Sequence, residues 1–446
     1  MPKKTMHIGF DDTDSTRKGC TTYVAALLVE KLQRFDTNFI DYPNLIRLNP
    51  NVPWKTRGNG ALCLRIQHDE SDEDDIKEAV ISAVEENADM EFKGTDPGIV
   101  FLQEVRIPQE IRVFAKHAVT GIVTLKEASR LLAKFNGEAV GFKNGRGIIG
   151  GLAAIGETLQ GDCTYEILAY RTPKNCGLKR RLDEASIFNM DKRTAPHTFN
   201  NVDAERHRII VTPRGPDPIL FGIRGETAEI VKKAFGMVRP LEPVDRWVVF
   251  RTNQGTDAHL TSINKLSQLT PYSSVIAKGV VAANPKMIRG RHVIFPISDD
   301  SAQVDCAAYE PSGVLSRAAR ELITEDCVEV YGSVRGPSRG TPLTVNLEKI
   351  RLLKLAPRTV YHNPVCPKCG KRLKSMGKNK GFRCEKCGLR DASAQKVESR
   401  LKRDVKRGLY ITSTRSQRHL TKPFVRYGME KRHGTSERLI ENWHFP

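Results

Sequence analysis

Two Cys-x-x-Cys pairs constrain the fold of this chain more tightly than any other pattern in its sequence. Cys366 and Cys369 form the first pair, and Cys384 and Cys387 form the second. Two such knuckles at this separation supply four thiolates to one tetrahedral zinc ion, whereas four free structural cysteines are the alternative. Because four thiolates close the coordination shell, the zinc has a structural role. We therefore predict a zinc ribbon over residues 359–390, with a basic loop between the knuckles that grips phosphates.

The balance of charges restricts the partners of the chain. Its 446 residues include 71 Lys and Arg against 52 Asp and Glu, a formal net charge of +19. This excess favours a polyanion, nucleic acid first of all, although a basic protein without such a partner is the alternative. No apolar run has membrane-spanning length, and residues 1–5 lack the apolar core of a signal peptide, so we expect a cytoplasmic protein with no membrane partner. In the cytoplasm, the ten cysteines of the chain are expected to be free thiols and metal ligands, not disulfides.

The first 136 residues show the pattern of an α/β domain. The apolar run 6–10 predicts a strand, and apolar residues recur at helical spacing over 24–35. A further strand is expected over 61–66 and a further helix over 76–84. A chain of this length is typical of about three or four domains, so domain 1–136 is expected to be the first of several.

Residues 137–268 alternate strands and helices in the βαββαβ order of a ferredoxin-like domain. A long polar excursion over 171–207 interrupts that order, and an extra strand is expected over 209–211. The expected elements are strand 139–142, helix 147–155, strands 165–170 and 219–223, helix 227–235 and strand 247–250.

Residues 269–358 look entirely β except for one helical segment, 314–322. Five strands with a helix between the third and the fourth form the pattern of the OB-fold barrel, a common binder of single-stranded nucleic acid. A small barrel that serves only as a spacer is the alternative. The expected strands are 274–281, 292–295, 302–309, 327–332 and 343–347.

Residues 391–446 are rich in lysine and arginine, with five aromatic residues interspersed. Basic and aromatic side chains together suit RNA, by charge and by stacking. A disordered tail is the competing interpretation, although the aromatic residues argue against complete disorder. The fold class expected for the whole chain is therefore a multidomain α+β protein that ends in a basic RNA-binding tail.

The segment from Phe10 to Ser15 holds the strongest indication of chemistry. It places Asp11, Asp12 and Asp14 between a strand and the start of a helix, at which Thr21 and Thr22 stand. Carboxylates hold Mg²⁺, and a helix N-terminus favours phosphate, so these parts make a nucleotide site without a Walker sequence. A plain capped turn after a strand is the alternative.

A second segment, Gly145–Gly151, contains GxGxxG, which alone is weak evidence for dinucleotide binding. No acidic residue follows in the Rossmann position, so two interpretations stay open: close helix packing, or an approach of the backbone to a ligand. Lys143, Asn144 and Arg146 are candidates for contacts to phosphate, nucleotide or RNA. The polar runs 224–226 and 251–259 follow or end strands, and each is either a wall of a site or a simple loop.

Taken together and in order, these segments resemble the archaeal tRNA(Ile) 2-agmatinylcytidine synthetase family. The resemblance rests on the strand–DDTDS–helix start, the loop 54–60, the run Gly145–Gly151, Arg251–Asp257, the OB-like region and the zinc ribbon. It covers nearly all of the chain. It implies an N-terminal kinase-like domain of unusual fold that uses ATP, followed by ferredoxin-like, OB and zinc-ribbon domains.

The resemblance also implies a reaction. The family attaches agmatine to C2 of the wobble cytidine of a tRNA(Ile) with a CAU anticodon, so that the codon AUA is read as isoleucine. ATP phosphorylates the cytosine C2 oxygen, and the agmatine amine then displaces it. The family's autophosphorylated threonine falls on Thr21, and its motif carboxylates fall on Asp11, Asp12 and Asp14.

Other contacts are less fixed by the resemblance. Thr22 and Arg57 are expected to contact ATP or substrate. Glu226 and Asp257 are candidates for binding the guanidinium group of agmatine. Together these expectations give ATP, Mg²⁺ and structural Zn²⁺ as cofactors.

Two other functions remain open from the sequence. One is a non-catalytic nucleic-acid-binding protein built on the OB fold and zinc ribbon, and the other is a kinase with an RNA-docking tail. The aspartate cluster discriminates against the first, because carboxylates beside an RNA backbone would repel it.

Overall fold

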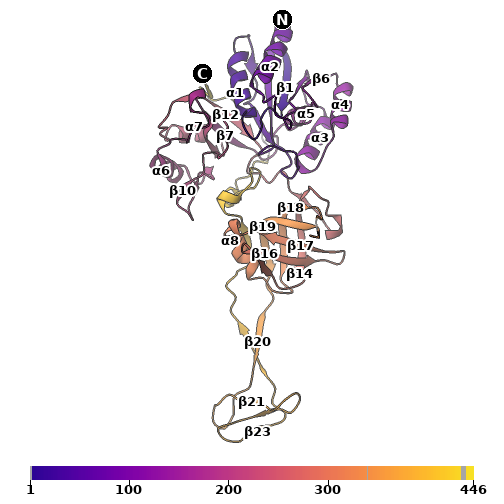
Figure 1. The fold of residues 1–446 in the computed structure, drawn as a ribbon, viewed down its shortest axis with the longest axis vertical. Coiled ribbons are helices and arrows are strands. Elements are labelled where there is room, and N and C mark those ends of the chain that lie inside the picture. The colour runs from indigo at the N-terminus through magenta and orange to yellow at the C-terminus, as the bar shows by residue number, and fades with distance from the viewer. Residues whose placement is uncertain (1–2, 339, 433–437) are drawn as a thin grey trace.

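The computed structural model describes residues 3–338, 340–432 and 438–446. In Figure 1 the molecule is long and has three parts: an α/β body that holds both termini, a barrel beneath it, and a small ribbon at the far end. Among the described residues, every helix is too short or too polar to cross a bilayer.

The first half of the body is a sheet covered by helices on both faces. Its strands lie in the order β6-β5-β1-β4-β3, and β2 also pairs with β4. Helices α1 and α2 cover one face, whereas α3, α4 and α5 cover the other. The elements are β1 (Lys4–Asp11), α1 (Thr21–Leu32), β2 (Asn38–Phe39), β3 (Asn44–Arg47), β4 (Gly60–His68), α2 (Glu73–Asn87), β5 (Gly98–Leu102), α3 (Gln109–Thr120), α4 (Leu125–Lys134), β6 (Glu138–Gly141) and α5 (Gly147–Gly156).

Strand β4 shows why both faces are covered. Leu62, Leu64 and Ile66 point into the core under α1, and Ala61 and Cys63 point into the core under α3 and α5. Because neighbouring residues of a strand face opposite sides, a run that is apolar throughout must be buried on both.

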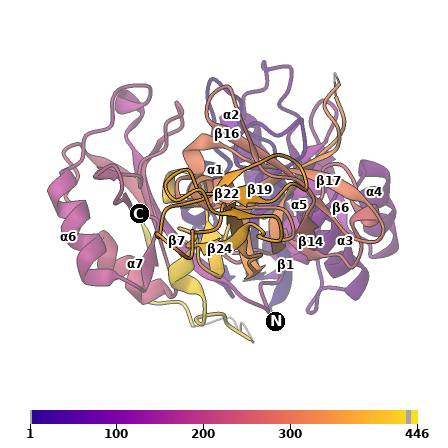
Figure 2. The same ribbon diagram turned by 90° about the horizontal axis from the view of Figure 1, so that it is seen from below.

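The second half continues the same sheet. Strand β3 pairs in parallel with β12, with Asn44 opposite Arg251 and Leu45 opposite Thr252. Strands β7, β11 and β8 follow β12, so that the whole sheet has eleven strands. Seen from below, α6 and α7 lie on one side of the molecule and α3 and α4 on the other (Figure 2). The elements are β7 (Thr164–Arg171), α6 (Glu184–Thr194), β8 (Thr198–Phe199), β9 (Val202–Asp203), β10 (Arg208–Ile209), β11 (Ile219–Gly225), α7 (Ala228–Phe235) and β12 (Val244–Thr252).

One expectation about this half is wrong. The sequence predicts residues 139–142 as the first strand of the ferredoxin-like order, but β6 pairs with β5 at the opposite edge of the sheet. Helix α5 likewise packs on β1, because Gly151 and Gly9 lack side chains and allow their backbones to meet. The remaining expected elements, β7, β11, α7 and β12, do lie side by side.

Residues 274–354 form the expected closed barrel of five main strands. Their order is β14-β18-β19-β17-β16, and a pairing between β14 and β16 closes the ring. In chain order, helix α8 lies between the third and fourth of these strands, β17 and β18, as expected. The interior of the barrel is one apolar cluster. The elements are β13 (Thr261–Ser262), β14 (Ser274–Val281), β15 (Lys286–Ile288), β16 (His292–Ser298), β17 (Gln303–Ala308), α8 (Val314–Arg320), β18 (Cys327–Arg335) and β19 (Thr344–Lys354).

A two-stranded stalk carries the ribbon away from the barrel. Strand β20 (Arg358–His362) leads outward and β24 (Val397–Leu401) returns beside it (Figure 1). The ribbon has its own small core around Cys366, Leu373, Phe382 and Cys384. Its strands are β21 (Lys374–Ser375), β22 (Phe382–Arg383) and β23 (Arg390–Asp391).

The segment expected to be a separate basic tail is instead built into the fold. Strand β25 (Gly408–Ile411) pairs with barrel strand β19, and β26 (His444–Phe445) pairs with β12 of the body. Between them, residues 412–432, here called the strap, run from the barrel to the body. Of the predicted tail, residues 433–437 lie outside the described residues. Backbone pairing with two sheets, which composition cannot reveal, is the reason for the difference.

Candidate active site

A cavity of about 480 Å³ lies where the two halves of the body meet. Strand β1, the start of α1, strand β3 and the loop before β4 contribute one wall. Strands β7 and β11 and the loop 210–217 contribute the facing wall, and His419 of the strap completes it. The parallel pairing of β3 with β12 therefore brings residues far apart in the sequence to one site.

Of the three predicted aspartates, Asp11 and Asp12 lie deepest against α5. A methyl group on Gly150 would lie only 2.0 Å from Oδ2 of Asp11, so this glycine makes room for the carboxyl group. Burial, reinforced by the neighbouring Asp12, raises the pKa of Asp11 to about 8. Asp12 has a φ of 61°, a left-handed conformation. Its carboxylate accepts a hydrogen bond from Nη2 of Arg146 at 2.8 Å.

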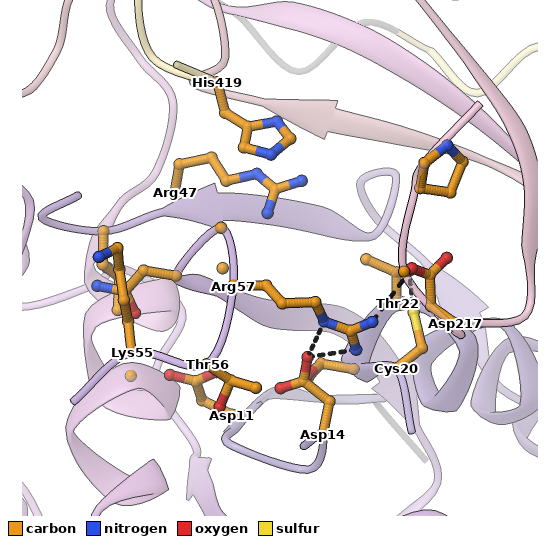
Figure 3. Close-up of a pocket in the computed structure, with 18 of the residues that line it drawn as sticks. Asp11, Asp14, Cys20, Thr22, Arg47, Lys55, Thr56, Arg57, Asp217 and His419 are labelled. Atoms are coloured by element: carbon orange, nitrogen blue, oxygen red, sulfur yellow. Dashed lines mark hydrogen bonds and ion pairs between the residues drawn. The ribbon is translucent and has the colours of Figure 1, made fainter. Parts of the chain in front are cut away.

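The third aspartate connects the two walls of the cavity. Asp14 accepts hydrogen bonds from Nε and Nη2 of Arg57 at 2.8 and 2.5 Å (Figure 3). The same guanidinium donates through Nη1 to Asp217, on the facing wall, at 3.1 Å. Arg57 thus spans the cavity between carboxylates of the two halves.

The start of α1 opens into the cavity. Cys20 is the N-cap residue and makes no side-chain capping bond, so the first backbone N–H groups are not capped by a side chain. Thr21 and Thr22 both line the cavity. The hydroxyl of Thr21 accepts a hydrogen bond from that of Thr13 at 3.1 Å, which leaves its own proton available for a ligand. A helix N-terminus with these groups suits a phosphate.

The glycine-rich segment serves close packing, the first of its two interpretations. A side chain on Gly151 would lie 2.8 Å from the carbonyl oxygen of Gly9, and one on Gly147 would lie 2.3 Å from the backbone nitrogen of Gly98. Helix α5 can therefore rest directly on β1 and β5. This contact places Arg146, just before the helix, at the cavity.

Lys143 and Asn144, the other candidates from this segment for ligand contacts, do not line the cavity. Nζ of Lys143 donates to the carbonyl oxygens of Phe92 and Thr95, both at 2.6 Å. Asn144 donates through its side chain to Asp96 at 3.1 Å. Both residues hold the loop before β5 in place.

Glu226 and Asp257, the candidates for the agmatine guanidinium, also lie away from the cavity lining. Both oxygens of Glu226 accept hydrogen bonds from the buried Arg426 of the strap, at 2.6 and 3.1 Å. Asp257 forms an ion pair with Lys349 at 2.5 Å and accepts from the backbone nitrogen of Lys422. These two carboxylates fasten the strap to the body and the barrel.

Four other residues complete the facing wall and the floor of the cavity: Arg47, Glu166, Arg224 and His419. Arg224 donates to Glu166 at 2.9 Å and approaches Nδ1 of His419 at 3.0 Å. Gln254, behind this wall, donates to the other oxygen of Glu166. Burial, then the charges of Arg47 and Arg224, lower the pKa of His419 well below its usual range. His419 is therefore neutral at physiological pH.

Arg47 closes the cavity at the end of β3. Its backbone is held by Asn253, which accepts from the Arg47 nitrogen at 2.8 Å and donates to its carbonyl oxygen at 3.0 Å. Burial lowers the pKa of Arg47 to about 10, so that it remains charged at neutral pH. The sequence singled out Arg224 within the run 224–226 as a wall of a site or a simple loop, and it lies in the cavity wall. Sequence reasoning missed Arg47, Glu166 and His419, because they occupy ordinary strand positions or come from the distant strap.

The four ribbon cysteines form a metal site. Their Sγ atoms all lie within 4.8 Å of one another, which fits one tetrahedral zinc ion. Backbone hydrogen bonding, chiefly from Cys387, lowers the pKa of Cys384 to about 6 and favours the thiolate. Among the described residues no second group of three or more such ligands converges in this way. Asp12 and Asp14 each face an arginine instead.

Comparison with known protein families gives three matches along the chain. Residues 7–70 match the TiaS TCKD domain, residues 145–259 the TiaS FLD domain, and residues 363–405 the TiaS C-terminal zinc ribbon domain. The cavity lies between the first two, and the four cysteines lie in the third.

Comparison with characterised proteins agrees. The tRNA(Ile) 2-agmatinylcytidine synthetase TiaS of Methanosarcina mazei is 43% identical, over 94% of this chain and 97% of its own length. That of Methanocaldococcus jannaschii is 42% identical over 94% and 98%. A complex of TiaS with tRNA(Ile) and ATP superposes with a TM-score of 0.86 at 38% identity, over 95% and 97% of the two chains. A complex of TiaS with tRNA(Ile), AMPCPP and agmatine gives 0.84 at 37% identity over the same shares.

Proposed function

The chain belongs to the TiaS family of tRNA(Ile) 2-agmatinylcytidine synthetases, and from this membership we propose that it uses ATP to attach agmatine to the tRNA(Ile) that carries a CAU anticodon. The observation that carries the proposal is the similarity over nearly the full length, which includes both walls of the cavity. The target is C2 of the wobble cytidine of that anticodon. A non-catalytic nucleic-acid-binding protein, the first alternative, would not need such a cavity.

We propose that the reaction proceeds in two steps within the cavity. The C2 oxygen of cytosine first attacks a phosphorus atom of ATP, a phosphoanhydride bond breaks, and the rest of the ATP leaves. This step is needed because a base oxygen is otherwise a poor leaving group. The primary amine of agmatine then attacks C2, and phosphate leaves. Phosphoryl transfer depends mainly on positioning and on neutralising charge. The target base must leave its stack to enter a cavity of this size.

The residues near α1 are assigned to the ATP end of the cavity. The N-terminus of α1 and Arg146 would bind phosphate oxygens, and Thr21 presents a hydroxyl there that would accept a phosphoryl group. Asp11, with Asp12 or Asp14, would hold Mg²⁺, which when bound neutralises phosphate charge and usually takes only one or two protein carboxylates. Arg57 would exchange its carboxylate partners for phosphate or substrate. We further propose OB-type binding of RNA by the barrel, with the zinc ribbon as a second contact.

The proposal is tested with purified full-length protein, labelled agmatine, ATP and transcribed tRNA(Ile) with a CAU anticodon. We expect label to enter the RNA only when ATP is present. A variant with Asp12→Ala should lose ATP turnover and incorporation while its tRNA affinity stays within a few-fold. Asp12 lies against Arg146 in the body and belongs to neither the barrel nor the ribbon.

Two outcomes would contradict the assignment. If ATP is consumed and no label enters RNA, the protein is a kinase with RNA-docking parts. If turnover is unchanged in the Asp12→Ala protein, the carboxylates do not form the nucleotide site. A variant with Asp36→Ala, an exposed aspartate, serves as the matched control.

A further inference from the structure

Arg47 differs from the other partly buried arginines of the cavity, because no carboxylate pairs with it. Within the part of the chain that the structure describes, its guanidinium makes no hydrogen bond or ion pair, and its Nε is buried without a partner. In Figure 3 it lies between His419 and Arg57, and no interaction is drawn to it. By contrast, Arg57 pairs with Asp14, Arg146 with Asp12, and Arg224 with Glu166.

The space around Arg47 is shaped for this side chain. A methyl group on Gly58 or on Gly60 would lie 2.8 Å from its Nη1. Asn253, from the other half of the body, holds its backbone on both sides. The two glycines thus leave room for the Arg47 side chain, and Asn253 fixes its backbone at the cavity. No carboxylate of the described residues forms an ion pair with its guanidinium group.

An unpaired charge in a confined site costs free energy, and buried polar groups are almost always satisfied by some partner. A guanidinium group matches the oxygens of a phosphoryl group in a two-pronged geometry. We propose that Arg47 binds phosphoryl oxygens from the wall of the cavity, as a substrate-binding residue that works beside the ATP end. The anion that completes its pairing enters with a substrate.

The chemistry of the substrates restricts which anion this is. The inference rests on the proposed function for the identities of those substrates. Agmatine carries two positive charges and no carboxylate, so Arg47 repels it, whereas Glu166 on the facing wall does not. His419 is neutral and adds no competing charge. The remaining anions are the phosphates of ATP and the phosphodiester that flanks the target base.

Two binding measurements with Arg47→Met distinguish these sources. The first titrates the full-length protein with a non-hydrolysable ATP analogue in the absence of RNA, and the second with the tRNA(Ile) transcript in the absence of ATP. A loss of at least tenfold in the first identifies an ATP phosphate, and the same loss in the second identifies the RNA phosphodiester. Arg47→Lys should recover part of the affinity. Arg34→Met, which removes an exposed arginine of the body that does not line the cavity, should change neither affinity more than twofold.

Thermal unfolding separates binding from structural support. Because Arg47 has no partner to lose, Arg47→Met should melt at the wild-type temperature or above it. Inorganic tripolyphosphate should raise the melting temperature of the wild-type protein more than that of the variant. The inference is overturned if both affinities stay within twofold of wild type, or if the variant melts well below it. All of these are binding or stability measurements, so they give an answer even if agmatine incorporation fails.

Discussion

Burial, then the charge of Asp12, govern the protonation of Asp11, a cavity carboxyl group without an arginine at ion-pair distance among the described residues. Its pKa of about 8 exceeds the ordinary 3.8, so between these values the folded state binds more protons than the unfolded state. In protein free of metal and nucleotide, the contribution of Asp11 to stability therefore falls as pH rises from about 4 to about 8. We predict that Asp11→Asn removes this decline and raises Tm by a few degrees at pH 8, with no difference near pH 4. Thermal unfolding in EDTA across this range is the measurement.

Asp36→Asn is the control for this prediction, because its side chain is largely exposed. It should leave the dependence of Tm on pH as in the wild type. Equal slopes in the wild type and Asp11→Asn would show that Asp11 ionises normally.

Single residues also show where sequence reasoning about the site succeeds. Motifs predict Asp11, Asp12, Asp14, Thr21 and Arg57, and all of them line the cavity. For the aspartates and Thr21 the signal is local, carboxylates and hydroxyls at the junction of a strand and a helix, whereas Arg57 follows from the family resemblance of loop 54–60. Four wall residues carry no such signal, because the pairing of distant strands, a loop and the strap bring them to the cavity; they are Arg47, Glu166, Asp217 and His419.

At the scale of elements, the contact between α5 and β1 depends on the absence of side chains. We predict that Gly151→Ala lowers the free energy of unfolding by about 1–3 kcal/mol, because the new methyl group would meet the carbonyl oxygen of Gly9. Urea unfolding is the measurement. The control is Gly161→Ala, where a methyl group meets nothing within 4 Å and the change should stay below about 0.5 kcal/mol. Similar values for the two variants would contradict the packing argument.

Elements with strong local patterns are predicted well from the sequence. The strands and helices that these elements pack against are not. The strand and helix of residues 4–32 and the five main barrel strands follow from apolar periodicity and length. Strand β6 is expected in the wrong half, because a strand of four residues carries too little pattern to choose its partner. The strap has no regular periodicity between β25 and β26, so its route between two sheets cannot be derived.

At the scale of the whole molecule, the body, the barrel and the ribbon have separate cores. Within the described part of the chain, the stalk β20–β24 joins the ribbon to the barrel (Figure 1). We predict that removing zinc with a chelator unfolds the ribbon alone and weakens tRNA binding at least tenfold, while affinity for an ATP analogue stays within twofold. Limited proteolysis locates the unfolding, and adding zinc back is the control. Loss of ATP-analogue binding on chelation would show that the ribbon supports the body.

The strap sets the order in which a newly made chain becomes competent. A ribosome completes the barrel, the ribbon and all of the body except β26 before it adds His419 and Arg426, the residues that finish the cavity wall and bind Glu226. A nascent chain halted anywhere earlier therefore holds an unfinished reaction chamber, although most of its mass has emerged. If the barrel and the ribbon bind RNA as proposed, prematurely terminated products would bind tRNA without altering it and would compete with the finished enzyme.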